Sequence, residues 1–152
     1  MNHAFRLIRG NDLKKEIINY CKNNKIEAGV IISAVGCIKH LHIRLAEAKS
    51  YIDKEDNYEI VSITGTVSKD DVHIHISVSD NNGVTIGGHL KNGTIVDTTC
   101  EVVIYELKDY IFAREFDEET GYDELKIKKA DWGNKYLKNK LLFTFNILNG
   151  II

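Results

Sequence analysis

The sequence predicts an α+β fold, built from a mainly antiparallel sheet with one main N-terminal helix. Apolar residues recur at helical spacing near the N-terminus, whereas much of the later chain alternates apolar and polar residues as β-strands do. The connections between these segments are short, which favours antiparallel pairing. The 152 residues contain no proline and no low-complexity linker, so we expect a single domain spanning residues 1–152.

The predicted helix follows a short strand at residues 5–8. Asn11 or Asp12 suits the N-cap position, because either side chain can accept a hydrogen bond from the first helical turn. Leu13, Ile17 and Cys21 then fall at positions i, i+4 and i+8, which places them on one buried stripe. The helix is expected to end around residues 23–24.

The strand predictions cover most of the remaining chain. In residues 58–67 we expect Val61, Ile63 and Val67 on one face. The segment 116–140 has charge and glycines but no steady period, so it is predicted to be a loop with one helical turn. The other strands are expected at residues 29–35, 41–46, 71–90 as a hairpin, 100–110 and 141–148.

Charge and hydropathy exclude several classes of function. The net charge of −2 gives no general basic excess of the kind that duplex DNA binders use to neutralise phosphates. Residues 115–124 are acid-rich and residues 126–140 are lysine-rich, which indicates solvated faces or, alternatively, a local phosphate-binding patch. The apolar runs are too short for a membrane span and the N-terminus does not resemble a signal peptide, so we expect a cytoplasmic protein without membrane contact.

The three cysteines are Cys21, Cys37 and Cys100. They form no CxxC pair and their number is odd, so we expect reduced and mostly buried thiols rather than disulfides. A zinc site built on cysteine is not expected.

Residues 71–90 carry the main candidate for function. Even positions from residue 72 to 78 are apolar and the odd positions are polar, so His73 and His75 share one strand face. If the loop is residues 81–83, with Gly83 in the left-handed conformation, His75 faces His89 and apolar residues meet on the other face. A slip of one residue would mix the two faces.

This register gathers His73, His75 and His89 into one cluster. Three neutral imidazoles on a rigid scaffold suit zinc or another late first-row divalent metal, with a fourth position left for water or substrate. The alternative is a solvated or hydrogen-bonded histidine cluster without metal. We expect Gly87 and Gly88 to leave open space beside the cluster.

Supporting residues are harder to predict. Ser77, Ser79, Glu59 or Glu101 are candidates to orient the metal ligands. None of them is identifiable as a general base, so the pattern favours a binding protein over an enzyme. His40 and His42 form a second His-x-His pair, for which the sequence offers no third ligand, and it is therefore not expected to bind a metal.

Several motifs together resemble the prokaryotic branch of the plant-and-prokaryote conserved (PPC) domain family. The resemblance runs from about residue 4 to residue 113. Its most specific element is the His-x-His pair followed by Gly87-Gly88-His89. The motifs that carry it are Phe5-Arg6-Leu7, Gly10-x-Asp12-Leu13, Ala28-Gly29, Ala34-Val35-Gly36, Tyr58-Glu59-Ile60-Val61-Ser62, Gly65, His73-x-His75, Gly83, Gly87-Gly88-His89 and Thr99-x-Glu101.

The resemblance implies a homotrimer and a role in assembly and partner binding. Plant members carry AT-hooks for the DNA minor groove, and prokaryotic members are often labelled DNA-binding by analogy. This chain has no Arg-Gly-Arg-Pro hook, so direct DNA binding is doubtful. The family's histidine trio carries over to His73, His75 and His89, and its recurrent arginine carries over to Arg44, at a subunit contact.

Two functions therefore follow from the sequence. The first is a small cytoplasmic homotrimeric PPC-domain protein, acting as a DNA-binding or regulatory module without an AT-hook. The alternative is a three-histidine metal-binding protein, with zinc as the expected metal, that acts on or senses a small molecule.

Overall fold

The computed structural model describes residues 1–131, in which eight strands and one α-helix follow one another. This confirms an α+β fold with a mainly antiparallel sheet. A single 3₁₀ turn, η1 (Ala46–Ala48), lies between the second and third strands. The elements are β1 (Asn2–Ile8), α1 (Leu13–Asn23), β2 (Gly29–Arg44), β3 (Tyr51–Val67), β4 (Val72–Ser79), β5 (Thr85–Leu90), β6 (Ile95–Glu106), β7 (Tyr110–Asp117) and β8 (Tyr122–Lys129).

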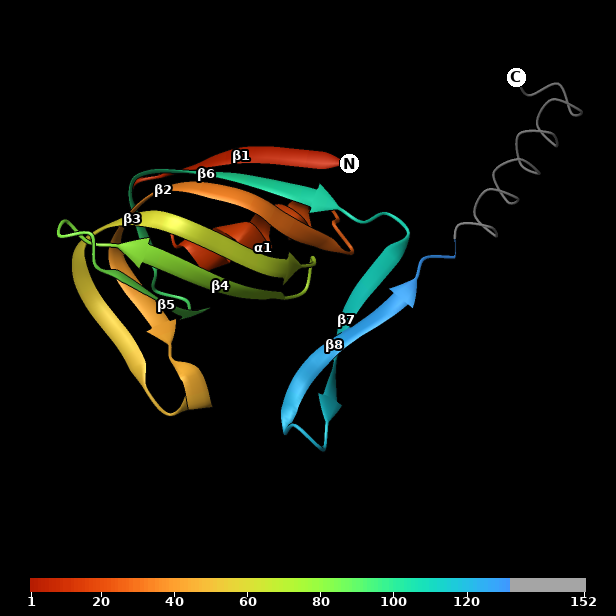
Figure 1. Cartoon of the computed structure of the whole chain (residues 1–152). Coiled ribbons are helices and arrows are strands. Elements are labelled where there is room, and N and C mark those ends of the chain that lie inside the picture. The colour runs from red at the N-terminus through yellow and green to blue at the C-terminus, as the bar shows by residue number, and fades with distance from the viewer. Residues whose placement is uncertain (132–152) are drawn as a thin grey trace, which may run out of the picture.

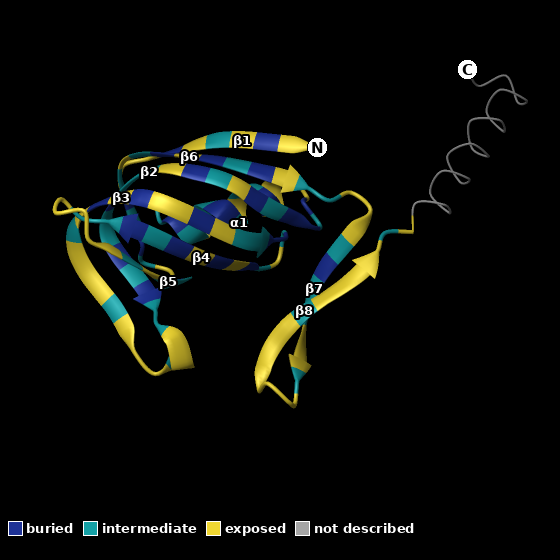
Figure 2. Cartoon of the chain, in the orientation of Figure 1, coloured by how far each residue is buried: buried dark blue, intermediate teal, exposed yellow. Residues whose placement is uncertain are grey.

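Six of these strands form one curled antiparallel sheet in the order β1-β6-β2-β3-β4-β5 (Figure 1). The sheet partly closes on itself, because β5 also pairs with the end of β2, with Ile43 opposite Leu90 and Arg44 opposite His89. Buried and exposed residues alternate along β4, and its buried face belongs to the same core as the buried stripe of α1 (Figure 2). One face of the sheet thus packs on the core, and the other carries the histidines.

The helix forms where the sequence predicts it. Asp12 is the N-cap, and its carboxylate accepts a hydrogen bond from the Lys15 backbone N–H at 3.2 Å. Leu13, Ile17 and Cys21 are fully buried, as the i, i+4, i+8 spacing requires. The same Asp12 carboxylate accepts from the Gly93 N–H at 2.8 Å, so the cap also ties the helix to the segment that follows β5.

Two strand predictions need correction. The segments predicted at residues 29–35 and 41–46 belong to one continuous strand, β2, which bends at register shifts instead of ending. In β3, Ile63 and Val67 are buried as expected, but Val61 is 57% exposed. A bulge between Ile60 and Ser62 adds one residue on this strand and moves Val61 to the outer face.

The loop predicted at residues 116–140 is wrong for the described part of that segment. Residues Tyr110–Asp117 and Tyr122–Lys129 form a two-stranded hairpin that projects from the main sheet (Figure 1). Nearly all of β8 is exposed, so no apolar face imposes a period-two pattern on its sequence. Accordingly, β6 ends at Glu106 and not at residue 110. The strand predicted at residues 141–148 lies outside the described residues.

The β7–β8 hairpin contacts the body of the protein, meaning the six-stranded sheet with α1 and its connecting loops, at a few points. Phe112 is buried, and its backbone N–H donates to the Glu27 carbonyl at 3.0 Å. Arg114 Nε lies 3.5 Å from Asp71 Oδ2. On the hairpin itself, Lys126 and Lys128 both pair with Glu115 across the two strands.

The cysteine predictions hold for two of three residues. All three thiols are free, and Cys21 and Cys100 are buried. Cys37 is only half-buried, and its Sγ donates to Glu59 Oε1 at 3.3 Å. No helix within residues 1–131 is both long and apolar enough to cross a lipid bilayer.

The glycines beside His89 act differently from the expectation. A Cβ at Gly87 would lie 2.7 Å from the Ile76 carbonyl oxygen, and one at Gly88 would lie 2.6 Å from the Arg44 carbonyl oxygen. These glycines therefore do not leave open space. They allow β5 to approach β4 on one side and β2 on the other.

We predict that Gly88→Ala lowers the free energy of unfolding by about 1–3 kcal/mol, because the added methyl group would separate β5 from β2. Urea denaturation followed by circular dichroism measures the change. Thr85→Ala, at an exposed position of the same strand, is the control and is expected to stay within about 0.5 kcal/mol of the wild type. Equal stability of Gly88→Ala and the wild type would contradict the assigned close approach.

Candidate metal centre

The predicted histidine cluster is present on the outer face of β4 and β5. The loop and register are those expected: Gly83 is left-handed with φ of 79°, and His75 lies opposite His89. Ring centroids of the three histidines are 5.1 Å (His73–His75), 5.0 Å (His73–His89) and 5.6 Å (His75–His89) apart. The local alternation of the hairpin thus brings all three imidazoles together.

The spacing of the ring nitrogens matches what a metal needs. One nitrogen from each of the three histidines lies within 4.8 Å of the others. The Nε2 atoms of His73 and His75 are 3.2 Å apart. Two nitrogens at ordinary zinc bond lengths and a tetrahedral angle would be about 3.3 Å apart. The cluster is therefore confirmed, and its role as a metal centre stays a prediction.

His89 is the most enclosed member of the cluster. Its Nδ1 is buried and has no hydrogen-bond partner among the described residues. Burial lowers the pKa of His89 to about 4, and the nearby charge of Arg44 adds to this effect. A neutral imidazole with an unsatisfied buried nitrogen is costly by itself, and metal ligation is one way in which proteins satisfy such a site.

His73 is also poised as a neutral imidazole. Burial lowers its pKa, and the neighbouring His75 and Arg114 act in the same direction. Metal ligation requires the unprotonated ring, so both shifts prepare the cluster for a cation at neutral pH.

A pocket of about 470 Å³ opens beside the cluster, between the body and the β7–β8 hairpin. Arg44, which the family resemblance assigns to a subunit contact, lines this pocket within the same chain. Sequence reasoning missed the other basic residues of the pocket, because they come from separate segments. Only Lys91, two residues after His89, carries a local signal, since i and i+2 share a strand face. The lining residues are Lys14, Arg44, Ala48, Tyr51, Asp71, Val72, His73, His89, Lys91, Arg114, Tyr122, Asp123 and Glu124.

The predicted supporting residues do not reach the histidines. Glu59 lies opposite Ser79 on the neighbouring strand, and both line a different pocket with Cys37. Glu101 is on β6, between β1 and β2, which the sheet order separates from β4. Ser77 lies opposite Gly87, and within residues 1–131 it makes no hydrogen bond to the cluster. On β3, threonines lie opposite two of the histidines, Thr66 opposite His73 and Thr64 opposite His75.

Both histidines of the second His-x-His pair are hydrogen-bonded to neighbouring residues. His40 Nε2 bonds to Asp53 Oδ1, and the His42 Nδ1–H donates to the Asn92 carbonyl oxygen at 2.7 Å. Burial and the hydrogen bond to Glu59 raise the pKa of the Cys37 thiol, which disfavours the thiolate form that a nucleophile needs.

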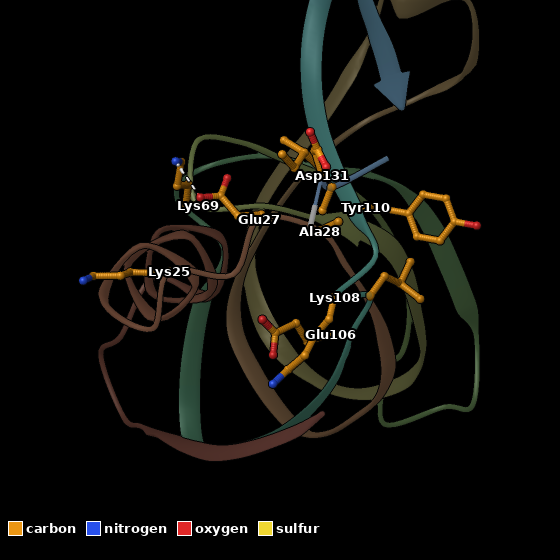
Figure 3. A pocket seen from close by; sticks show the side chains of 11 residues that line it. Lys25, Glu27, Ala28, Lys69, Glu106, Lys108, Tyr110 and Asp131 are labelled. Carbon is orange, nitrogen blue, oxygen red and sulfur yellow. Dashed lines mark hydrogen bonds and ion pairs between the residues drawn. The ribbon is translucent and has the colours of Figure 1, made fainter. Parts of the chain in front are cut away.

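A larger pocket, of about 560 Å³, lies at the base of the β7–β8 hairpin (Figure 3). Two of its carboxylates have basic partners: Lys69 for Glu27, within the lining, and His3 for Glu106, outside it. Lys69 Nζ lies 2.8 Å from Glu27 Oε1, and Glu106 Oε2 lies 3.2 Å from His3 Nε2. This pocket is larger than the one beside the histidines. We nevertheless take the pocket beside the histidines as the candidate site, because the ring nitrogens of the cluster converge there.

Comparison with known proteins places the chain in a family. The profile of the Plants and Prokaryotes Conserved (PCC) domain matches residues 1–108, so the chain belongs to this family. The bifunctional protein GlmU of Synechococcus sp. (strain JA-3-3Ab) is 37% identical over 128 residues, which cover 84% of this chain and 21% of GlmU. The chain thus spans about a fifth of the length of that relative.

Two solved structures share both fold and sequence with this chain. A hypothetical protein from Salmonella enterica is 32% identical, with a TM-score of 0.81 over 85% of this chain and 94% of the other. A metal-containing protein from Archaeoglobus fulgidus is also 32% identical, with a TM-score of 0.69 over 83% of this chain and 93% of the other.

We predict that the metal-free protein loses stability as the pH falls from about 6.5 toward 4. In this window an unfolded chain protonates its histidine near its ordinary pKa of 6.5, whereas folded His89 resists protonation until about pH 4. The unfolded state therefore binds more protons, and the free energy of unfolding rises with pH.

Urea titrations at pH 4.5, 5.5 and 7 in the presence of a chelator measure this effect. The slope with pH is expected to be smaller in His89→Gln, because that variant lacks the titrating ring. An identical slope in the wild type and this variant would contradict the prediction.

Proposed function

We propose that the protein binds a divalent metal ion, zinc by preference, through His73, His75 and His89, and that the bound metal holds or senses a small molecule. The observation that carries the proposal is the convergence of three imidazole nitrogens within 4.8 Å on one rigid hairpin. The metal-containing relative from Archaeoglobus fulgidus supports it.

The donor set suits this ion. Three neutral nitrogen ligands are typical of open zinc sites, in which a fourth position takes water or substrate. When bound, such a metal supplies Lewis acidity to a ligand oxygen. The histidines hold the ion, while β4 and β5 fix their mutual geometry. Neither of the predicted carboxylates, Glu59 and Glu101, lies at the cluster, where it could act as a general base. This favours binding or sensing over catalysis.

A regulatory module that contacts DNA is the alternative role, and the family resemblance is its main support. The described part of the lysine-rich segment gives it little help, because Lys126 and Lys128 are already paired with Glu115. The chain also has a net charge of −2. Direct contact with duplex DNA is therefore not the function that the charge distribution favours.

We propose further that the chain assembles as a homotrimer. Large apolar side chains are exposed on three adjacent strands: Val35 of β2 at 60%, Val61 of β3 at 57% and Tyr105 of β6 at 45%. An apolar patch of this kind on a sheet face is typical of a surface covered by another subunit. The family resemblance supports a trimer over other assemblies.

The metal proposal predicts that His75→Ala loses metal. Removing a residue that merely supports a ligand costs 10–100-fold in metal affinity, so loss of a ligand is expected to cost on the order of 100-fold or more. Untagged protein is loaded with zinc, dialysed and measured by elemental analysis.

The matched control is His40→Ala, which removes one histidine from the other His-x-His pair and is expected to keep its zinc. Equal zinc content in the wild type and His75→Ala would remove the proposed site. Zinc loss in both variants would indicate a general loss of structure, which circular dichroism detects.

The trimer proposal predicts that a Val35→Asp, Val61→Asp double variant elutes as a monomer of the 17.3 kDa chain, because two buried carboxylates per subunit would oppose association. Light scattering after size exclusion gives the mass. A double variant at the exposed hairpin positions, Phe116→Asp and Ile127→Asp, is the control. A monomeric wild type at micromolar concentration would overturn the proposal.

A further inference from the structure

The pocket beside the histidine cluster gathers four cationic side chains from four parts of the chain. Lys14 comes from α1, Arg44 from β2, Arg114 from β7, and Lys91 follows β5 directly. All four are half-buried. Positive charges are seldom brought together at partly buried positions without a reason, because each loses solvation and repels the others.

Among the described residues, three of these four cations form no ion pair. Arg114 pairs with Asp71 at 3.5 Å. Within residues 1–131, the side chains of Lys14, Arg44 and Lys91 make no ion pair and no hydrogen bond. The remaining acids of the pocket, Asp123 and Glu124, are exposed on β8 and are therefore well solvated.

The cations influence one another and the histidines electrostatically. Burial lowers the pKa of Lys14, and Lys91 and Arg114 act in the same direction, although Asp71 and Asp12 oppose them. Among the charged residues near His89, Arg44 lowers the pKa of His89 the most. A bound anion would relieve both the mutual repulsion and the loss of solvation.

The position of Arg44 connects the pocket to the metal centre. Arg44 lies opposite His89 in the pairing of β2 with β5, and His73 and His89 both line the pocket. An anionic group held by Arg44 is therefore placed beside a cation held by the histidines. The volume of about 470 Å³ fits a small metabolite rather than a polymer.

We propose that this pocket binds a small molecule that carries an oxyanion, either a carboxylate or a phosphate, with Arg44, Lys14 and Lys91 holding the oxyanion beside the metal. This ligand class deepens the proposed metal-binding function and depends on it for the second contact. Guanidinium and ammonium groups are the side chains that proteins use for such oxyanions.

The test uses full-length protein loaded with cobalt(II), whose visible absorption reports on the coordination of the ion. Inorganic phosphate and lactate are titrated separately, so the two arms distinguish phosphate from carboxylate. Calorimetry with the same probes is run on loaded and on metal-free protein. Saturable binding of at least one probe is expected, together with a change in the cobalt spectrum.

The variants Arg44→Gln and Lys14→Gln are expected to bind the probe on the order of 10-fold more weakly and to keep their cobalt. The controls are Arg9→Gln on the body surface and Lys22→Gln in the last turn of the same helix, which should bind as the wild type does. Melting temperatures show whether each variant is folded.

The outcomes separate the two proposals. Two results would overturn the oxyanion pocket and leave the metal centre intact. The first is that cobalt-loaded protein binds neither probe. The second is that the Arg44→Gln variant and the wild type bind the probe equally well. Failure to retain cobalt overturns the metal centre. In that case, calorimetry on metal-free protein still supports the pocket if the probe binds and Arg44→Gln weakens it, and overturns the pocket otherwise.

Discussion

The close approach of β5 to both of its neighbours is the constraint on which the rest of the site depends. β5 pairs with β4 along its length and with the last residues of β2, and Gly88 is the position at which its backbone meets the Arg44 carbonyl. The same contact that closes the sheet therefore places His89 opposite His75 on one side and opposite Arg44 on the other. A side chain at Gly88 would disturb the sheet, the histidine cluster and the basic pocket together.

The electrostatics of the site follow from this packing. Enclosure lowers the pKa values of His73 and His89, which favours the neutral rings that a metal ion requires as ligands. Arg44 and Lys14 line the same pocket, and neither forms an ion pair within residues 1–131. The neutral histidines suit a metal cation, and the basic side chains beside them suit an anion. The site as a whole therefore suits a metal ion together with a negatively charged small molecule.

The family match covers only part of this pocket. The PCC profile ends at residue 108, so the histidines, Lys14, Arg44 and Lys91 belong to the matched region. The hairpin formed by β7 and β8 lies beyond it and contributes Arg114 and the exposed acids of the far wall. The family core thus supplies the proposed metal and oxyanion contacts, and the hairpin completes the enclosure.

Local patterns determined the parts of this protein that the sequence predicts correctly. The helix and its Asp12 cap, the turn at Gly83 and the pairing of His75 with His89 all depend on residues close together in the chain, where periodicity and turn chemistry leave few alternatives. The histidine cluster was predictable for that reason. The family could also be identified, because its motifs are local.

Tertiary structure alone decided the rest, because those features depend on segments far apart in the chain or on faces that nothing buries. The bulge that turns Val61 outward changes side-chain direction without any signal in composition. The β7–β8 hairpin has little apolar burial, so its sequence shows no alternation to read. The pocket gathers Lys14, Arg44 and Arg114 only after the sheet curls and the hairpin docks, and no sequence spacing encodes that meeting.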